Sequence, residues 1–206
     1  YKGSGFDRGH LAPAGDMKRS YGAMSESFFM SNISPQDPSF NRGIWKKLES
    51  KVRDWAIDNK KLYVVTGPVL SDNYSTIGNN KVSIPEYFYK VLIDIEEPSL
   101  KGIGFILPNR RSKESLSSYA VTIDYVEDVT GINFYHHLED DIENKIESEL
   151  NLEKWDFSKS NSRSSYTHSS KNKLPIKGLI SVNEASKKEL MSLPGIGDKL
   201  SNKIIR

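Results

Sequence analysis

A polar stretch near the C-terminus limits how much of this 206-residue chain can fold into one domain. Residues 158–172 read Ser-Lys-Ser-Asn-Ser-Arg-Ser-Ser-Tyr-Thr-His-Ser-Ser-Lys-Asn and are almost devoid of large apolar side chains. Such a segment buries too little apolar surface to offset the entropy lost on ordering, which is typical of flexible linkers. We therefore expect a folded domain at residues 1–157, a flexible linker at residues 158–173 and a small separate unit at residues 174–206.

The charge of the chain changes sign at the same place. Residues 1–157 contain 19 Lys and Arg against 24 Asp and Glu, whereas residues 158–206 contain 10 against 3. Residues 1–90 contain 13 basic and 9 acidic side chains. A polyanion should therefore prefer the two ends of the chain. The chain has no cysteine, which excludes disulfides, thiolate zinc sites and thiol nucleophiles. No run approaches the ~18 apolar residues that a membrane-spanning helix needs.

The two ends of the chain are unusual for a complete protein. It begins at Tyr1 without an initiator Met or a signal-like segment, and it stops at Arg206 within a predicted helix. We expect both ends to be cut from a longer protein.

The hydrophobic pattern of the first domain predicts an α+β fold with a mixed or antiparallel sheet. Short stretches rich in β-branched and aromatic residues, bounded by Gly, Pro or Asn, predict strands at residues 28–33, 62–66, 88–95 and 102–107. Apolar residues that recur at spacing three or four predict helices at residues 41–57 and 138–152.

Residues 6–17 place an acid, a guanidinium and an imidazole close together. Asp7, Arg8 and His10 surround Gly9, which lets the backbone come close to a ligand. An imidazole with a pKa near ~6.5 can take a proton from water at neutral pH, and a guanidinium can hold two phosphoryl oxygens. The alternative is a hydrogen-bonded core histidine beside a surface ion pair, and this motif alone supports both interpretations equally.

A second pattern follows within forty residues. Residues 31–36 read Ser-Asn-Ile-Ser-Pro-Gln at the end of a predicted strand, and Asn41 opens the long predicted helix. The order strand, strand, helix can aim the imidazole of His10 and the amide oxygen of Asn41 at one point. An amide carbonyl with water molecules suits a hard cation such as Mg²⁺.

Taken in order, these motifs resemble those of the sugar-nonspecific DNA/RNA endonucleases of the DRGH type, similar to endonuclease G. The active site of that family is a ββα-metal finger. The resemblance extends over residues 3–157 and includes the stretches at residues 3–11, 31–36, 41–49 and 66–68. It implies a Mg²⁺-dependent endonuclease that cleaves DNA and RNA, with Mn²⁺ as an alternative ion, and it leaves a homodimer open.

The resemblance also implies a role for each matching residue. His10 would be the general base, Asn41 the direct protein ligand of the metal, Arg8 a stabiliser of phosphate charge, and Asn32 a hydrogen-bonding support. The family has a further arginine upstream of the DRGH motif, and this chain begins too late to include it.

Glu49 corresponds to an acidic residue of the family that influences the metal. In a straight helix its Cα would lie about 12 Å along the axis from that of Asn41. The two side chains could not then bind the same ion directly. We therefore expect Glu49 to act through water or through a neighbouring ligand.

The tail carries a second signal, in residues 194–197, Pro-Gly-Ile-Gly. Free backbone N–H groups at Gly195, Ile196 and Gly197, with Lys199 nearby, would offer a phosphate site at the start of a helix. The segment resembles the first half of a helix-hairpin-helix module of competence-type DNA receptors, a small all-α hairpin that binds DNA. A plain helical hairpin is the alternative for the tail. For the whole chain, the alternative is a catalytically inactive nucleic-acid-binding or DNA-uptake protein on the same fold.

Overall fold

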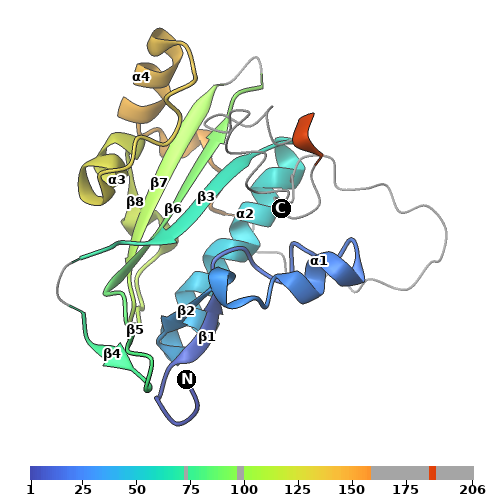
Figure 1. Ribbon diagram of the computed structural model, residues 1–206. Helices are drawn as coiled ribbons and strands as arrows, with labels where there is room; N and C mark the ends of the chain where they lie inside the picture. The colour runs from blue at the N-terminus through green and yellow to red at the C-terminus, as the bar shows by residue number, and fades with distance from the viewer. Residues whose placement is uncertain (72–73, 97–99, 159–185, 189–206) are drawn as a thin grey trace.

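The computed structural model describes residues 1–71, 74–96, 100–158 and 186–188, and Figure 1 shows how their elements are arranged. Its centre is a four-stranded antiparallel sheet in the order β3-β6-β7-β8. The strands are β3 (Tyr63–Pro68), β6 (Tyr87–Asp94), β7 (Lys101–Pro108) and β8 (Ala120–Val121). The α+β class is confirmed, and three predicted strands correspond to β3, β6 and β7.

Two short antiparallel pairs and several helices complete the described part of the chain. The pairs are β1 (Asp7–His10) with β2 (Ile33–Gln36), and β4 (Thr76–Ile77) with β5 (Val82–Ser83). The α-helices are α1 (Tyr21–Glu26), α2 (Lys46–Asp58), α3 (Ile123–Thr130) and α4 (Asp140–Ser148). Single turns of 3₁₀-helix form η1 (Met30–Asn32), η3 (Leu116–Tyr119) and η4 (Leu152–Lys154), and a π-helical segment forms η2 (Phe40–Trp45).

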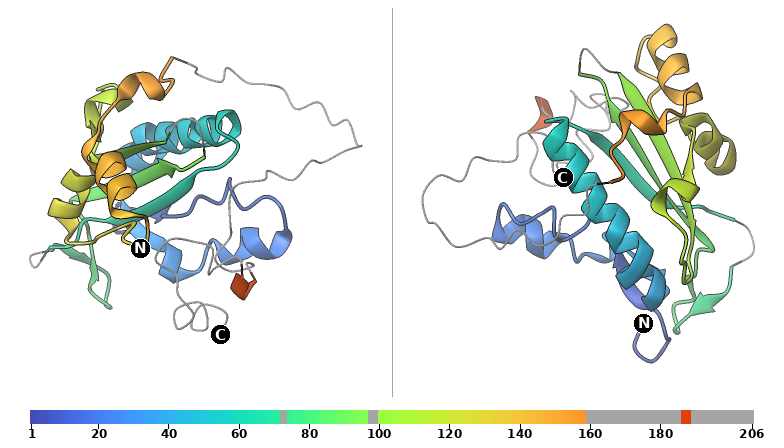
Figure 2. Two further views of the ribbon diagram at one scale, coloured as in Figure 1. Left: turned by 90° about the horizontal axis from the view of Figure 1, so that it is seen from above. Right: turned by 180° about the vertical axis from the view of Figure 1, so that it is seen from behind.

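The alternation of side chains along β6 builds a three-layered structure. Phe88 and Leu92 point to the face covered by α2, whereas Val91 and Ile93 point to the face covered by α3 and α4. Figure 1 shows α3 and α4 on one side of the sheet and α2 on the other. The view from behind (Figure 2, right) shows the β1–β2 pair beside the beginning of α2. The order strand, strand, helix predicted around His10 is therefore present.

Glycines on β7 let α3 and α4 approach the sheet closely. A Cβ atom on Gly102 would lie 2.7 Å from side-chain carbons of both Ile123 and Ile146, and one on Gly104 would lie 2.6 Å from Val126. These separations are shorter than van der Waals contact, so a larger residue would push the helices away.

The long helical stretch predicted at residues 41–57 is confirmed, but it begins earlier and is not straight. The carboxylate of Asp37 caps its beginning by accepting hydrogen bonds from the backbone N–H groups of Ser39 (2.8 Å) and Phe40 (3.2 Å). The first turns are π-helical, and Gly43 departs from helical geometry with φ −105° and ψ −111°. The Cα separation expected between Asn41 and Glu49 assumed a straight α-helix, and this segment is not one.

Two predicted elements need correction. The strand expected at residues 28–33 is wrong, because residues 28–32 form a turn and η1, and the strand is β2. Pro35 is tolerated in β2 because a two-stranded pair has only edge strands. The helix expected at residues 138–152 is shorter, since α4 ends at Ser148 and Leu150 is exposed.

The predicted linker beyond Ser158 and the predicted helix-hairpin-helix, apart from residues 186–188, lie outside the described residues. So do its residues Gly195, Ile196, Gly197 and Lys199. In the part of the chain that the structure describes, no helix is both long and apolar enough to span a membrane.

Candidate active site

The pairing of β1 with β2 explains the glycine of the Asp-Arg-Gly-His motif. Gly9 lies beside the side chain of Gln36, which is fully buried. A Cβ atom on Gly9 would lie 2.1 Å from Cδ of Gln36, so any larger residue would collide with it. Gly9 therefore lets the two strands pair while Gln36 stays buried between them.

His10 ends β1, half-buried against an aromatic ring. Its ring meets that of Phe28 edge to face, with 4.6 Å between centroids and 87° between planes. Burial lowers the pKa of His10, so the imidazole is neutral at neutral pH. Nε2 is buried and has no hydrogen-bond partner among the described residues. A neutral imidazole with an unpaired nitrogen is the form that can accept a proton.

Asn32 fixes the chain that follows His10. Its side-chain oxygen accepts from the backbone N–H of Ala12, and its amide nitrogen donates to the carbonyl oxygens of Ala12 and Ser27. Its own carbonyl accepts from the backbone N–H of Leu11 at 3.0 Å. Four hydrogen bonds of 2.8 to 3.0 Å thus hold the segment that follows β1 in place.

Asp7 controls the orientation of the Asn41 side chain. The amide nitrogen of Asn41 donates to Oδ2 of Asp7 at 2.9 Å, and the guanidinium of Arg42 donates to both oxygens of the same carboxylate. These partners hold the pKa of Asp7 below its ordinary value, Arg42 having the largest effect. Because an ionised carboxylate only accepts hydrogen bonds, the carbonyl oxygen of Asn41 must point away from Asp7.

Arg8 is exposed on β1. Its guanidinium carbon lies 5.9 Å from the ring centroid of Tyr1. Arg8 and His10 are two residues apart on one strand, so their side chains lie on the same face of it.

Glu49 lies within a group of charged residues between α2 and the sheet. Its pKa is raised to about 6, mainly by burial and also by Asp16, against the opposing effects of Lys90 and Arg53. Asp16 forms an ion pair with Arg53 at 2.8 Å. Asp16 also belongs to the loop that follows His10, so this ion pair connects the loop to α2.

Lys90 is a residue that the sequence analysis missed. Its ammonium group is buried, donates to Oγ1 of Thr66 at 2.6 Å and lies 4.8 Å from the ring centroid of Trp45. Burial lowers the pKa of Lys90 to about 8, and the carboxylate of Glu49 opposes this effect. A lysine between Phe88 and Leu92, at a core-facing position of a strand, was the signal that could have identified it.

The predicted site residues come from neighbouring elements without contacting one another directly. His10 and Arg8 lie on β1, Asn41 is hydrogen-bonded to β1 through Asp7, and Asn32 holds the segment after β1. No hydrogen bond joins His10, Asn41 and Glu49 among the described residues. No hydrogen bond to the side-chain oxygen of Asn41 or to the carboxylate of Glu49 is seen among the described residues. An amide oxygen and a carboxylate are both ligands that suit a hard divalent cation which keeps most of its water.

Comparisons with known proteins show which family the chain resembles. Residues 1–141 match the model of the family described as DNA/RNA non-specific endonuclease. Nuclease C1 of Cunninghamella echinulata var. echinulata is 38% identical over 152 residues, which cover 68% of this chain and 60% of that protein. Mitochondrial endonuclease G of Bos taurus is 35% identical over 147 residues, which cover 65% and 49% of the two chains.

A solved structure is similar as well. The crystal structure of the EndoG/EndoGI complex, described as showing the mechanism of EndoG inhibition, matches with a TM-score of 0.61 and 33% identity, and covers 68% of this chain and 62% of that chain. This chain spans about half the length of the curated relatives it matches. It belongs to the DNA/RNA non-specific endonuclease family, which confirms the resemblance carried by the sequence motifs.

Proposed function

We propose that this chain is the catalytic part of a Mg²⁺-dependent nuclease that hydrolyses phosphodiester bonds in DNA and RNA. The observation that supports this most directly is the state of His10, a neutral imidazole with an unpaired Nε2 at the end of β1. Family membership supports a nucleic acid as the substrate.

In this proposal His10 removes a proton from the water molecule that attacks phosphorus. Its neutral form is the reactive one, and a positioned base typically accelerates such a step by ~10²–10⁴. Arg8, on the same face of β1, would bind the phosphate oxygens and oppose the negative charge that develops on them. Asn32 would keep the segment after His10 from moving during the reaction.

Asn41 would hold the cation through its carbonyl oxygen, which Asp7 turns away from itself. Glu49 would act through a water molecule or a neighbouring ligand. The bound cation would supply positive charge to the phosphate and to the departing oxygen. Mg²⁺ is the ion we propose because one amide oxygen and water molecules suit it, and Mn²⁺ is the alternative.

Neither the base nor the 2′-hydroxyl of a nucleotide takes part in this chemistry. We therefore expect little preference between DNA and RNA. Residues 1–157 would form the nuclease domain, and the basic tail at residues 174–206 would add affinity for DNA through a helix-hairpin-helix. A homodimer stays a prediction, which analytical ultracentrifugation can test.

The proposal is tested by incubating the purified chain with plasmid DNA and with total RNA, in Mg²⁺ and in excess chelator. We expect degradation of both nucleic acids in Mg²⁺ and none with the chelator. His10→Ala should reduce the rate by about 10²–10⁴ while DNA binding is retained. His136→Ala, at an exposed histidine outside this site, is the matched control and should leave the rate unchanged.

Cleavage that is insensitive to His10→Ala would contradict the assignment of the base. Binding without any cleavage by the wild-type chain would favour the alternative, a catalytically inactive nucleic-acid-binding protein.

A further inference from the structure

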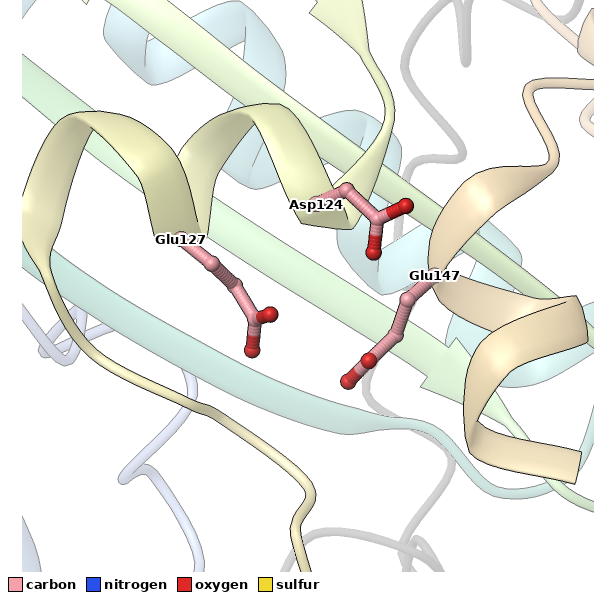
Figure 3. A group of neighbouring side chains, drawn as sticks. All are labelled: Asp124, Glu127 and Glu147. Atoms are coloured by element: carbon pink, nitrogen blue, oxygen red, sulfur yellow. The ribbon is translucent and has the colours of Figure 1, made fainter. Parts of the chain in front are cut away.

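An acidic group lies on the face of the sheet opposite the candidate active site. Asp124 and Glu127 belong to α3, and Glu147 belongs to α4. One carboxylate oxygen from each of the three lies within 4.8 Å of the other two, and Figure 3 shows Glu127 and Glu147 reaching toward each other below Asp124. We call these three residues the α3–α4 acidic group.

Helical spacing explains how the group is assembled. Asp124 and Glu127 are three residues apart and lie on the same face of α3. Glu143 and Glu147 are four residues apart on α4, so Glu143 adds a fourth carboxylate beside the group. The ion pairs seen among the described residues include none of these four carboxylates.

Glu147 is in an environment that disfavours its charge. Glu147 is only 5% exposed, and its Oε1 has no hydrogen-bond partner among the described residues. Burial, as the largest cause, and the carboxylates of Glu127, Glu143 and Asp124 together raise its pKa to about 8. A buried carboxylate surrounded by like charges needs either a proton or a cation.

Tyr135 provides a second, independent observation at the same place. It is 2% exposed, and its hydroxyl has no hydrogen-bond partner among the described residues. Its ring packs in the same buried cluster as Val126 and Ile146, the residues next to Glu127 and Glu147 in the sequence. Burial raises the pKa of its hydroxyl, and the charges of Glu147 and Glu127 act in the same direction. A neutral hydroxyl is an oxygen donor, so it adds to the donor set without adding charge.

We propose that the α3–α4 acidic group binds a divalent cation of the Ca²⁺ class, at a site separate from the nuclease centre. The carboxylates of the group and the Tyr135 hydroxyl all offer oxygen atoms, which are the ligands that Ca²⁺ prefers. Ligands on opposite sides of one Ca²⁺ lie about 4.6–5.2 Å apart, since each Ca–O bond is about 2.3–2.6 Å long. The separations within the group therefore fit one ion. The exposed Asp124 gives the ion access from solvent.

The bound cation links two helices that the sequence joins only through a turn and a loop. It neutralises the like charges of α3 and α4 at the point where these helices meet. The expected consequence is a more stable packing of both helices on β7, with no part in the cleavage chemistry.

The first test measures the thermal unfolding of the full chain carrying Asn41→Ala, which removes the proposed ligand at the nuclease centre. With Ca²⁺ at a hundredfold excess over its Kd, we expect the melting temperature to rise by about 5–10 °C relative to chelator. Adding Glu147→Gln should abolish the rise. Glu147→Gln mimics the protonated side chain, so the variant should fold at least as well as its parent.

The matched control is Asp128→Asn, which removes one exposed carboxylate from α3 outside the group. It should keep most of the Ca²⁺ response. A similar response in the Glu147→Gln and Asp128→Asn variants would overturn the proposal, because the effect would then be nonspecific. No response in the parent chain would overturn it as well.

The second test uses Tb³⁺, which occupies Ca²⁺ sites and luminesces when a nearby aromatic ring transfers energy to it. Excitation of the Asn41→Ala chain near 280 nm should give Tb³⁺ emission that Ca²⁺ displaces. Tyr135→Phe should keep the protein folded and lower the affinity, because one oxygen donor is lost. Emission that persists unchanged in the Glu147→Gln variant would show that the ion binds elsewhere.

Discussion

Asp7 shows how a single carboxylate can decide what a neighbouring amide offers to a ligand. Its carboxylate accepts one hydrogen bond from the side-chain amide of Asn41 and two from the guanidinium of Arg42. The sequence motif contains Asp7, but nothing in the sequence pattern connects it to a residue 34 positions later. That connection requires the pairing of β1 with β2 and the start of the helix, which are features of the fold.

Asp7→Asn should weaken the proposed metal binding through Asn41. An asparagine at this position can donate as well as accept, so the Asn41 amide is free to turn, and Arg42 loses its ionic partner. We expect the Mg²⁺ concentration for half-maximal cleavage to rise by about 10–100-fold. Magnesium titrations of the cleavage rate measure this. Asp128→Asn serves as the control, and an equal shift in both variants would contradict the role of Asp7.

Other residues of the candidate site differ in how visible they are from sequence. His10, Arg8, Asn32 and Asn41 were identified because they belong to ordered motifs. Lys90 and the Asp16–Arg53 pair were missed, because their importance comes from lying beside Glu49 after folding. The acidic group of α3 and α4 was missed for a similar reason, since acidic residues at helical spacing usually indicate a solvated face.

Among the elements, the β1–β2 pair depends on one close approach. Gly9→Ala would place a Cβ atom 2.1 Å from Cδ of Gln36, so the buried glutamine must move or the strands must separate. We expect a loss of about 1–3 kcal/mol in the free energy of unfolding, measured by denaturant unfolding. Gln36→Ala in the same chain should recover part of this loss. A double variant as unstable as the sum of the two single variants would contradict the direct contact.

The elements also show where hydrophobic patterns succeed. β6 and β7 were predicted because their stretches are rich in β-branched and aromatic residues, and the long helical stretch because its apolar residues recur at spacing three or four. The strand predicted at residues 28–33 failed because Phe28, Phe29 and Met30 are exposed and have no alternating pattern of burial. Their β-rich composition reflects a surface turn beside His10 rather than a strand.

The packing of α3 on α4 should make stability depend on pH when divalent cations are removed. An ordinary carboxyl group has a pKa of about 4.3 in an unfolded chain, and the pKa of Glu147 in the folded protein is about 8. Between these values the folded state binds more protons, so rising pH destabilises it until the pH passes about 8.

Glu147→Gln removes this titration. In chelator, we expect the variant and the wild type to have similar melting temperatures near pH 5, with the variant increasingly more stable toward pH 9. Thermal unfolding at several pH values measures the difference between the two proteins. A difference that does not change with pH would contradict the raised pKa of Glu147.

At the scale of the whole molecule, the central sheet separates the two sites that we propose. The proposed nuclease centre lies at the β1–β2 pair and α2, and the α3–α4 acidic group lies across the sheet from it. Residues 91–157 hold 15 acidic and 6 basic side chains, so this part of the protein should repel nucleic acid. Binding energy for a polyanion must therefore come from the N-terminal half and from the basic tail.

The basic tail should add affinity for DNA without changing the chemistry. Residues 158–206 hold 10 basic and 3 acidic side chains, and the composition of residues 158–173 predicts a flexible linker with a reach of about 20–25 Å. A tail tethered in this way raises the local concentration of DNA without entering the chemistry. Deleting residues 159–206 should therefore weaken duplex binding and flatten its dependence on salt, because fewer counterions are released, while kcat at saturating substrate stays nearly constant.

The full chain carrying Gly195→Val and Gly197→Val keeps every charge of the tail and changes only the proposed turn. It should lose part of the affinity, since bulky β-branched residues would block the approach of backbone N–H groups to a phosphate. The Kd for duplex DNA measured over about 50–200 mM salt separates the two contributions. If the glycine variants bind like the wild type while the deletion binds weakly, the tail acts through charge alone. Equal affinities and equal salt slopes for all three chains would mean that the tail does not contact DNA.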